Sequence, residues 1–184
     1  MDPTNPMTEL AWPDPHHVNA TIGWLMLGNV AEARVEFEKI STPSRPLPQV
    51  LGVEWSLLSQ EQRWDEAVVA AEAQLTATPD DPEPWIHRSF ALHELRRTRE
   101  AFNSLLPAAA RFPTETIIPY NLACYRCQLG DLPEARRWFA RALASGKSPA
   151  EKRLRLRAAL QDADLQPLWP EFRLLLDDLP AEKS

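Results

Sequence analysis

The fold is decided by TIIPYNLACYRCQLGDLPEARRWFARAL, which runs from Thr116 to Leu143. Its pattern predicts two short helices, Ile117 to Leu129 and Pro133 to Leu143, joined by a tight turn. Gly130 can take the left-handed conformation that ends a helix, and Asp131 is a favourable N-cap for the next one. Neither helix can bury its apolar face alone, so this hairpin requires neighbours.

The neighbours are marked by a Glu-Ala pair that recurs every 34 residues, as Glu32-Ala33, Glu66-Ala67, Glu100-Ala101 and Glu134-Ala135. A 34-residue period with two helices per unit is the signature of tetratricopeptide repeats. The chain therefore resembles the tetratricopeptide repeat (TPR) family over about Asp14 to Pro149. The resemblance implies an all-α, right-handed superhelix of four helix-turn-helix repeats with a C-terminal capping helix. It does not name a ligand, because such arrays serve many partners.

The repeat pattern predicts three parts: a flexible lead over residues 1–13, four repeats over 14–149, and capping helices with a tail over 150–184. Ser148 and Glu151 predict a capping box that starts a helix of about Pro149 to Gln161. That helix should cover the open end of the array. The apolar residues after it should fold back onto the array; they are Leu165, Leu168, Trp169 and Phe172.

Two repeats depart from the family pattern. The turn of the second repeat lacks glycine, and Arg96 replaces the turn glycine of the third. Trp55 stands where the family prefers a small residue between the two helices. We therefore expect the second repeat to be splayed or locally repacked.

The composition excludes several classes of function. The net charge is −6, which argues against nucleic acid or an anionic membrane as the main partner. No apolar run approaches the roughly 18 residues that cross a bilayer. The N-terminus has neither the basic nor the apolar region of a signal peptide. We therefore expect a cytoplasmic protein that neither binds nucleic acid nor enters a membrane.

Residues that could carry chemistry are sparse. The sequence has no glycine-rich phosphate loop, no GxSxG and no HExxH motif. Cys124 and Cys127 form a CxxC match, but a zinc site needs two more ligands and a redox pair belongs at a helix start. We expect packing or groove roles for both, with metal binding, oxidation or redox activity as the alternatives. No enzyme activity, cofactor or metal is predicted.

Basic clusters occur at Arg96–Arg99, Arg136–Arg141 and Lys152–Arg157. Acidic residues flank each cluster, so solvated helix faces with local ion pairs are the favoured interpretation over phosphate binding.

The resemblance implies that the first helix of each repeat lines a concave, peptide-binding groove. Asn19 and Asn121 could bridge a peptide backbone with one amide each, while Ile22, Phe90 and Tyr120 would offer apolar pockets. Lys and Arg are absent from these positions, so the carboxylate-clamping mode of some family members is not expected. The predicted groove residues are Asn19, Ile22, Met26, Ser56, Gln60, His87, Phe90, His93, Tyr120, Asn121, Cys124 and Gln128.

The favoured function is a non-catalytic scaffold that binds a peptide or apolar segment of a partner protein in this groove. One alternative is a chaperone for a secreted or co-produced client, and another is an accessory subunit of an enzyme complex. The groove could also lack a specific ligand. The sequence leaves open whether the array forms homo-oligomers.

Overall fold

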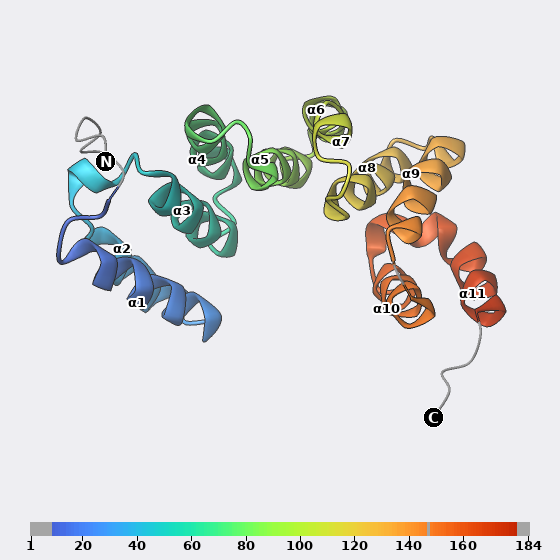
Figure 1. The fold of residues 1–184 in the computed structure, drawn as a ribbon, viewed down its shortest axis with the longest axis horizontal. Helices are drawn as coiled ribbons and strands as arrows, with labels where there is room; N and C mark the ends of the chain where they lie inside the picture. Colours follow the sequence, from blue (N-terminus) through green and yellow to red (C-terminus); the bar gives the residue numbers. More distant parts are fainter. Residues whose placement is uncertain (1–8, 147, 180–184) are drawn as a thin grey trace, which may run out of the picture. The chain divides into compact units, whose positions relative to one another are not determined.

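The computed structural model describes residues 9–146 and 148–179 (Figure 1). Most of the predicted N-terminal lead, and the tail after Leu179, lie outside the described residues. Within them the regular structure is entirely helical, which confirms the all-α prediction. The helices, in chain order, are α1 (Asp14–Met26), α2 (Val30–Glu38), η1 (Thr42–Ser44), α3 (Pro48–Gln60), α4 (Trp64–Ala77), α5 (Pro82–Glu94), α6 (Thr98–Leu105), α7 (Ala108–Arg111), α8 (Ile117–Gln128), α9 (Leu132–Ala144), α10 (Pro149–Ala159), η2 (Ala163–Leu168) and α11 (Trp169–Asp178).

The alanine of each Glu-Ala pair occupies the same place in successive helices. It is the fourth residue of α2, α4, α6 and α9, and all four side chains are 0% exposed; they are Ala33, Ala67, Ala101 and Ala135. A methyl group at this point lets the neighbouring helix approach closely, whereas a larger side chain would force the two apart. The 34-residue period of the sequence therefore marks the buried positions at which the helices pack closely.

The turns follow the same period. Gly28 and Gly130 have φ of +72° and +80°, and Gln62 and Arg96 reach the same left-handed region at +57° and +62°. Each lies one residue after the C-cap of its helix, where a positive φ reverses the chain. The missing glycines therefore do not change the turn; the two larger residues adopt the glycine conformation.

The second helix of the third repeat is interrupted. It begins as α6 and continues after Leu106 and Pro107 as the single turn α7. Proline has no backbone N–H to donate to the preceding turn, so the helical hydrogen-bond ladder stops there.

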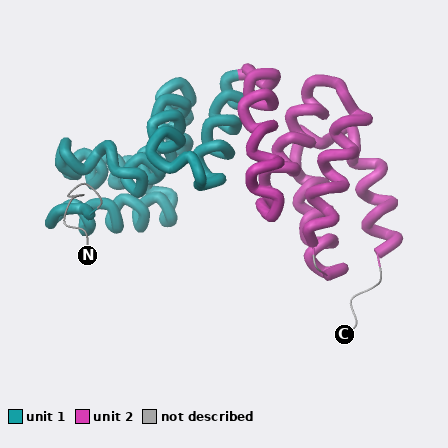
Figure 2. The backbone as a smooth tube through the Cα atoms, turned by 45° about the horizontal axis from the view of Figure 1, so that its top comes forward, with its two compact units in different colours: residues 1–95 teal, residues 96–184 magenta. Residues whose placement is uncertain are grey.

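The chain divides into two compact units, residues 1–95 and 96–184 (Figure 2). The division falls within the third repeat, between α5 and α6. The first unit holds the α1–α2 and α3–α4 hairpins, with α5 packed on α4; the second holds the α8–α9 hairpin and the C-terminal helices.

In the first unit, Asp14 ties the start of α1 to the loop that follows α2. Its buried carboxylate accepts hydrogen bonds from the backbone N–H of Ser41 at 2.9 Å and from the hydroxyls of Ser41 and Ser44 at 2.5 Å each. These bonds lower the pKa of Asp14, those from the Ser41 and Ser44 side chains being the largest cause. The network fixes η1 against α1.

In the second unit, the C-terminal segment folds back onto the last hairpin. Leu165 and Leu168 of η2 are fully buried, and Phe172 of α11 stacks on Phe139 of α9 with ring centroids 4.1 Å apart. The indole N–H of Trp169 donates to the carbonyl of Ala159 at 2.9 Å. The predicted return of these residues is confirmed, and η2 packs directly on α8.

Candidate functional site

Four of the predicted groove residues meet in the first unit. Ile22 and Met26 of α1, together with Ser56 and Gln60 of α3, line an open hollow of about 220 Å³ floored by Leu25 and Val53. Because Ile22 and Met26 lie four residues apart, they share one face of α1. Met26 is 83% exposed, so this helix presents a large apolar side chain to solvent at the rim.

The polar side chains of the hollow form hydrogen bonds to backbone carbonyls of the helices that line it. The Gln60 amide donates to the carbonyl of Leu25 at 3.4 Å, which joins the ends of α3 and α1. The Ser56 hydroxyl donates to the carbonyl of Gly52 within its own helix at 2.9 Å. Asn19 lies one turn before Ile22 and is exposed. The hollow is therefore apolar apart from Ser56 and the Gln60 amide, and Asn19 does not line it.

His87, Phe90 and His93 of α5 lie elsewhere in the first unit. The His87 ring stacks on Trp55 with centroids 3.7 Å apart and planes 5° apart, and burial lowers the pKa of His87 to about 4. Phe90 is edge-on to Trp55 and Trp64. His93 is buried.

This aromatic cluster explains how Trp55 fits a position that favours small residues. Its ring packs outward onto α5, while α3 and α4 remain packed together. Of the two predicted alternatives for the second repeat, local repacking is the one observed.

In the second unit, the predicted groove residues of α8 contact the chain's own C-terminal segment. The Tyr120 hydroxyl donates to Asp162 Oδ2 at 2.9 Å, and the Cys124 thiol lies 3.7 Å from the same oxygen. The Gln128 amide donates to the carbonyl of Asp164 at 3.0 Å. Asn121, next to them, is half-buried. Segment 162–168 thus covers the face of α8 that was predicted to receive a ligand.

The environment of the two cysteines disfavours thiolate chemistry. Both are buried and free. Burial is the main cause that raises the pKa of Cys124 well above its ordinary value and that of Cys127 to about 11. A thiol with such a pKa stays protonated near neutral pH and is a poor nucleophile and metal ligand. Among the described residues, no cluster of His, Cys, Asp and Glu could hold a metal ion.

Ion pairs account for much of the basic surface. Arg97 pairs with Glu100 and Arg137 with Glu134, each across one helical turn, at 2.7 and 2.9 Å. Arg136 makes a forked contact with Glu171 of α11. These contacts fit the interpretation of the clusters as solvated helix faces. No helix in the described ranges has both the length and the apolar character needed to cross a bilayer.

Charge is distributed unevenly between the two units. Residues 1–95 hold 15 acidic and 5 basic side chains, whereas residues 96–184 hold 11 acidic and 15 basic ones. The modest net charge of the whole chain hides this asymmetry. The hollow between α1 and α3 therefore belongs to a strongly acidic unit.

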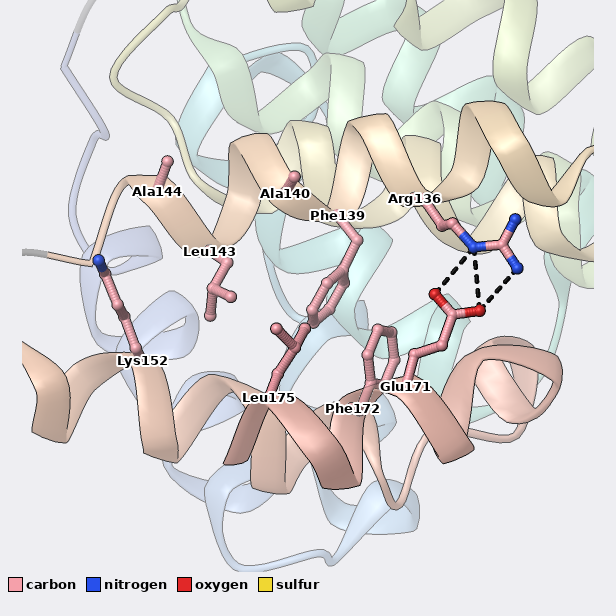
Figure 3. Close-up of a pocket in the computed structure, with 9 residues that line it drawn as sticks. All are labelled: Arg136, Phe139, Ala140, Leu143, Ala144, Lys152, Glu171, Phe172 and Leu175. Carbon is pink, nitrogen blue, oxygen red and sulfur yellow. Dashed lines mark hydrogen bonds and ion pairs between the residues drawn. The ribbon is translucent and has the colours of Figure 1, made fainter. Parts of the chain in front are cut away.

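A second concave feature, which the sequence did not suggest, lies in the second unit. A slot of about 370 Å³ runs between α9 and α11, with Phe139 and Leu143 facing Phe172 and Leu175 (Figure 3). Ala140 and Ala144 complete the α9 wall. The Arg136–Glu171 pair and Lys152 stand at opposite ends. The α9 residues lie on one helix face, as their spacing in the sequence would allow one to predict. The opposite side comes from α11, which lies outside the repeats, so the repeat pattern could not reveal the slot.

The periodic alanines, the periodic left-handed turns and the stacked hairpins define a helical-repeat protein with the TPR fold. Solved structures agree with this assignment. The chain superposes on TTC0263, a TPR protein of Thermus thermophilus, with a TM-score of 0.66 and 17% identity over 88% of this chain and 99% of that one. Pseudomonas aeruginosa PilF gives 0.66 and 16%, covering 92% and 78% of the two chains.

A third similar structure is MamA from Desulfovibrio magneticus, with a TM-score of 0.66 and 18% identity over 73% of this chain and 78% of that one. The resemblance to TPR proteins is thus confirmed for the fold. No family model and no curated protein matches the sequence.

Proposed function

We propose that this protein is a non-catalytic interaction scaffold that binds an apolar segment of a partner protein in the hollow between α1 and α3. The observation that carries the proposal is the convergence of Ile22, Met26, Ser56 and Gln60 on one apolar depression. Met26 is largely exposed in the free protein, so burying it under a ligand would add favourable apolar burial. The TPR fold supports the scaffold class.

The site is confined to the first unit in this proposal. On α8 the equivalent groove positions already contact Asp162 and Asp164, and the leucines of η2 seal that face. A ligand there would have to displace two fully buried leucine side chains, at about 2 kcal/mol each. The hollow on α1 and α3 needs no such displacement.

The acidic excess of the first unit favours a partner segment with basic residues beside its apolar anchor. Opposite charge speeds encounter and selects among partners. We expect added salt to weaken the complex, because screening acts on solvent-exposed charges.

The test uses the full-length chain to capture partners from its native host, followed by mapping of the bound segment and measurement of its Kd by fluorescence anisotropy. Met26→Asp should weaken binding roughly tenfold or more, since about 1.4 kcal/mol corresponds to a factor of ten. Leu27→Asp is the matched control, because Leu27 is 76% exposed beside Met26 but does not line the hollow. Equal effects of the two substitutions would remove the proposal.

A further inference from the structure

The slot between α9 and α11 is unused by the proposed scaffold function. Its volume of about 370 Å³ falls within the range of small-molecule sites. The lining is apolar: Phe139 and Phe172 touch across the base of the slot, Ala140, Leu143 and Ala144 of α9 lie on one side, and Leu175 of α11 lies on the other. The α9 wall from Arg136 to Ala144 is about 12 Å long, at the helical rise per residue. Such a slot suits a single extended alkyl chain.

The two ends of the slot differ in charge. At one end Arg136 and Glu171 neutralise each other, at an N–O distance of 2.6 Å. At the other end stands Lys152, and among the described residues no carboxylate pairs with its ammonium group. A charged end group would therefore be placed by Lys152 alone, and it would be an anion.

The position of Lys152 is constrained. Its stem lies against Gly146, where an added Cβ would come within 3.0 Å of Lys152 Cγ. The glycine leaves room for the lysine stem beside the end of α9. The stem of Lys152 thus packs beside the end of α9, and the residue lies at one end of the slot.

From these features we propose that the slot binds a free alkyl carboxylate of medium chain length. The alkyl chain lies across the stacked rings of Phe139 and Phe172, beside Leu143 and Leu175, and the carboxylate pairs with Lys152. The Arg136–Glu171 pair closes the far end, because a second charged group there would find no unpaired partner. The site is independent of the hollow between α1 and α3.

Calorimetric titration of the full chain with sodium octanoate tests the proposal, with octanol as the uncharged probe. Wild type should bind octanoate saturably. Ala140→Phe should weaken binding roughly tenfold, because Ala140 is exposed on the α9 wall and a ring there fills the slot without disturbing the core. Ala144→Phe is a second filling variant at the Lys152 end, and circular dichroism verifies that both variants fold.

The carboxylate contact is tested separately. Lys152→Gln should weaken octanoate binding about fivefold, the upper range for a solvent-accessible ion pair, and should leave octanol binding unchanged. Arg157→Gln on the same helix is the control, because Arg157 is exposed and does not line the slot. Absence of saturable octanoate binding would overturn the proposal. So would octanoate affinity that neither filling variant changes, or equal effects of Lys152→Gln on both probes.

Discussion

At the scale of single residues, four left-handed turn positions are spaced by the repeat, but only two of them are glycine. A residue with a side chain is disfavoured by about 1 kcal/mol in this conformation, whereas glycine adopts it freely. Gln62 nonetheless holds it between the packed helices α3 and α4, and Arg96 holds it between α5 and α6. The fold thus imposes the turn on residues that disfavour it.

Gln62→Gly should therefore stabilise the protein by about 0.5–1 kcal/mol, the conformational gain being partly offset by the greater freedom of glycine in the unfolded chain. Gly28→Gln, the reciprocal change at the first turn, should destabilise it by about 1 kcal/mol. Urea denaturation followed by circular dichroism measures both. A Gln62→Gly variant no more stable than wild type would show that the side chain makes compensating contacts.

Asp14 should make stability depend on pH. Hydrogen bonds from Ser41 and Ser44 hold the folded pKa of Asp14 below its ordinary value of 3.8. The ionised carboxylate therefore stabilises the fold at all pH values above about 4, and this contribution is lost as the pH falls through the lower folded pKa.

Asp14→Asn should lower the free energy of unfolding by about 1.5–3 kcal/mol near neutral pH, the range for hydrogen bonds to a charged group. The difference from wild type should shrink as the solution is acidified, as thermal melts over a pH series would reveal. Glu38→Gln, on the exposed face of α2, serves as control and should have little effect at any pH. A loss that is constant with pH would mean that charge is not the cause.

At the scale of elements, η2 determines which part of the repeat surface is free. Its leucines fill the face of α8, and Asp162 receives the Tyr120 hydroxyl. Fully buried leucines contribute about 2–5 kcal/mol each when compared with alanine. The segment is therefore firmly packed in the second unit.

Leu168→Ala should destabilise the second unit by about 2–5 kcal/mol and make Cys124 more accessible, because the segment that covers it is held less firmly. Labelling with a thiol-reactive dye, assigned by peptide mass spectrometry, should be faster at Cys124 than in wild type. Leu174→Ala is the control, since Leu174 is largely exposed on α11. Unchanged labelling of Cys124 in a folded Leu168→Ala variant would contradict the covering role of η2.

The sequence predicts the repeats well because their signals are local and periodic. Ala33 and its three counterparts, and the caps Asp131 and Ser148, are found where the pattern expects them. The cover on α8 could not be predicted in the same way. The Tyr120–Asp162 hydrogen bond joins residues 42 apart in sequence, and the segment around Asp162 has no period that links it to α8. The His87–Trp55 stack is also a pairing between helices that no motif encodes.

At the scale of the whole molecule, the chain consists of two compact units whose boundary lies within a repeat. In repeat proteins each element is stabilised mainly by its neighbours, so stability is distributed along the chain. Leu57 is fully buried in the first unit and Leu122 in the second.

Leu57→Ala should therefore reduce amide hydrogen-exchange protection mainly in residues 9–95, and Leu122→Ala mainly in residues 96–179. Exchange measured by mass spectrometry on peptic fragments resolves the two ranges. Comparable loss of protection in both ranges from either substitution would show that the chain unfolds as one cooperative body.

Because η2 packs on α8, the positions at which further repeats can be inserted into this protein are limited. A 34-residue repeat inserted after Leu47 would have helical hairpins of the same kind on both sides, because Pro48 begins the second repeat. A repeat inserted after Ala144 would instead compete with Leu165 and Leu168 of η2 for the apolar surface of α8. Longer chimeras should accordingly be built by insertion near the N-terminal modules, with the C-terminal segment left as the fixed stop.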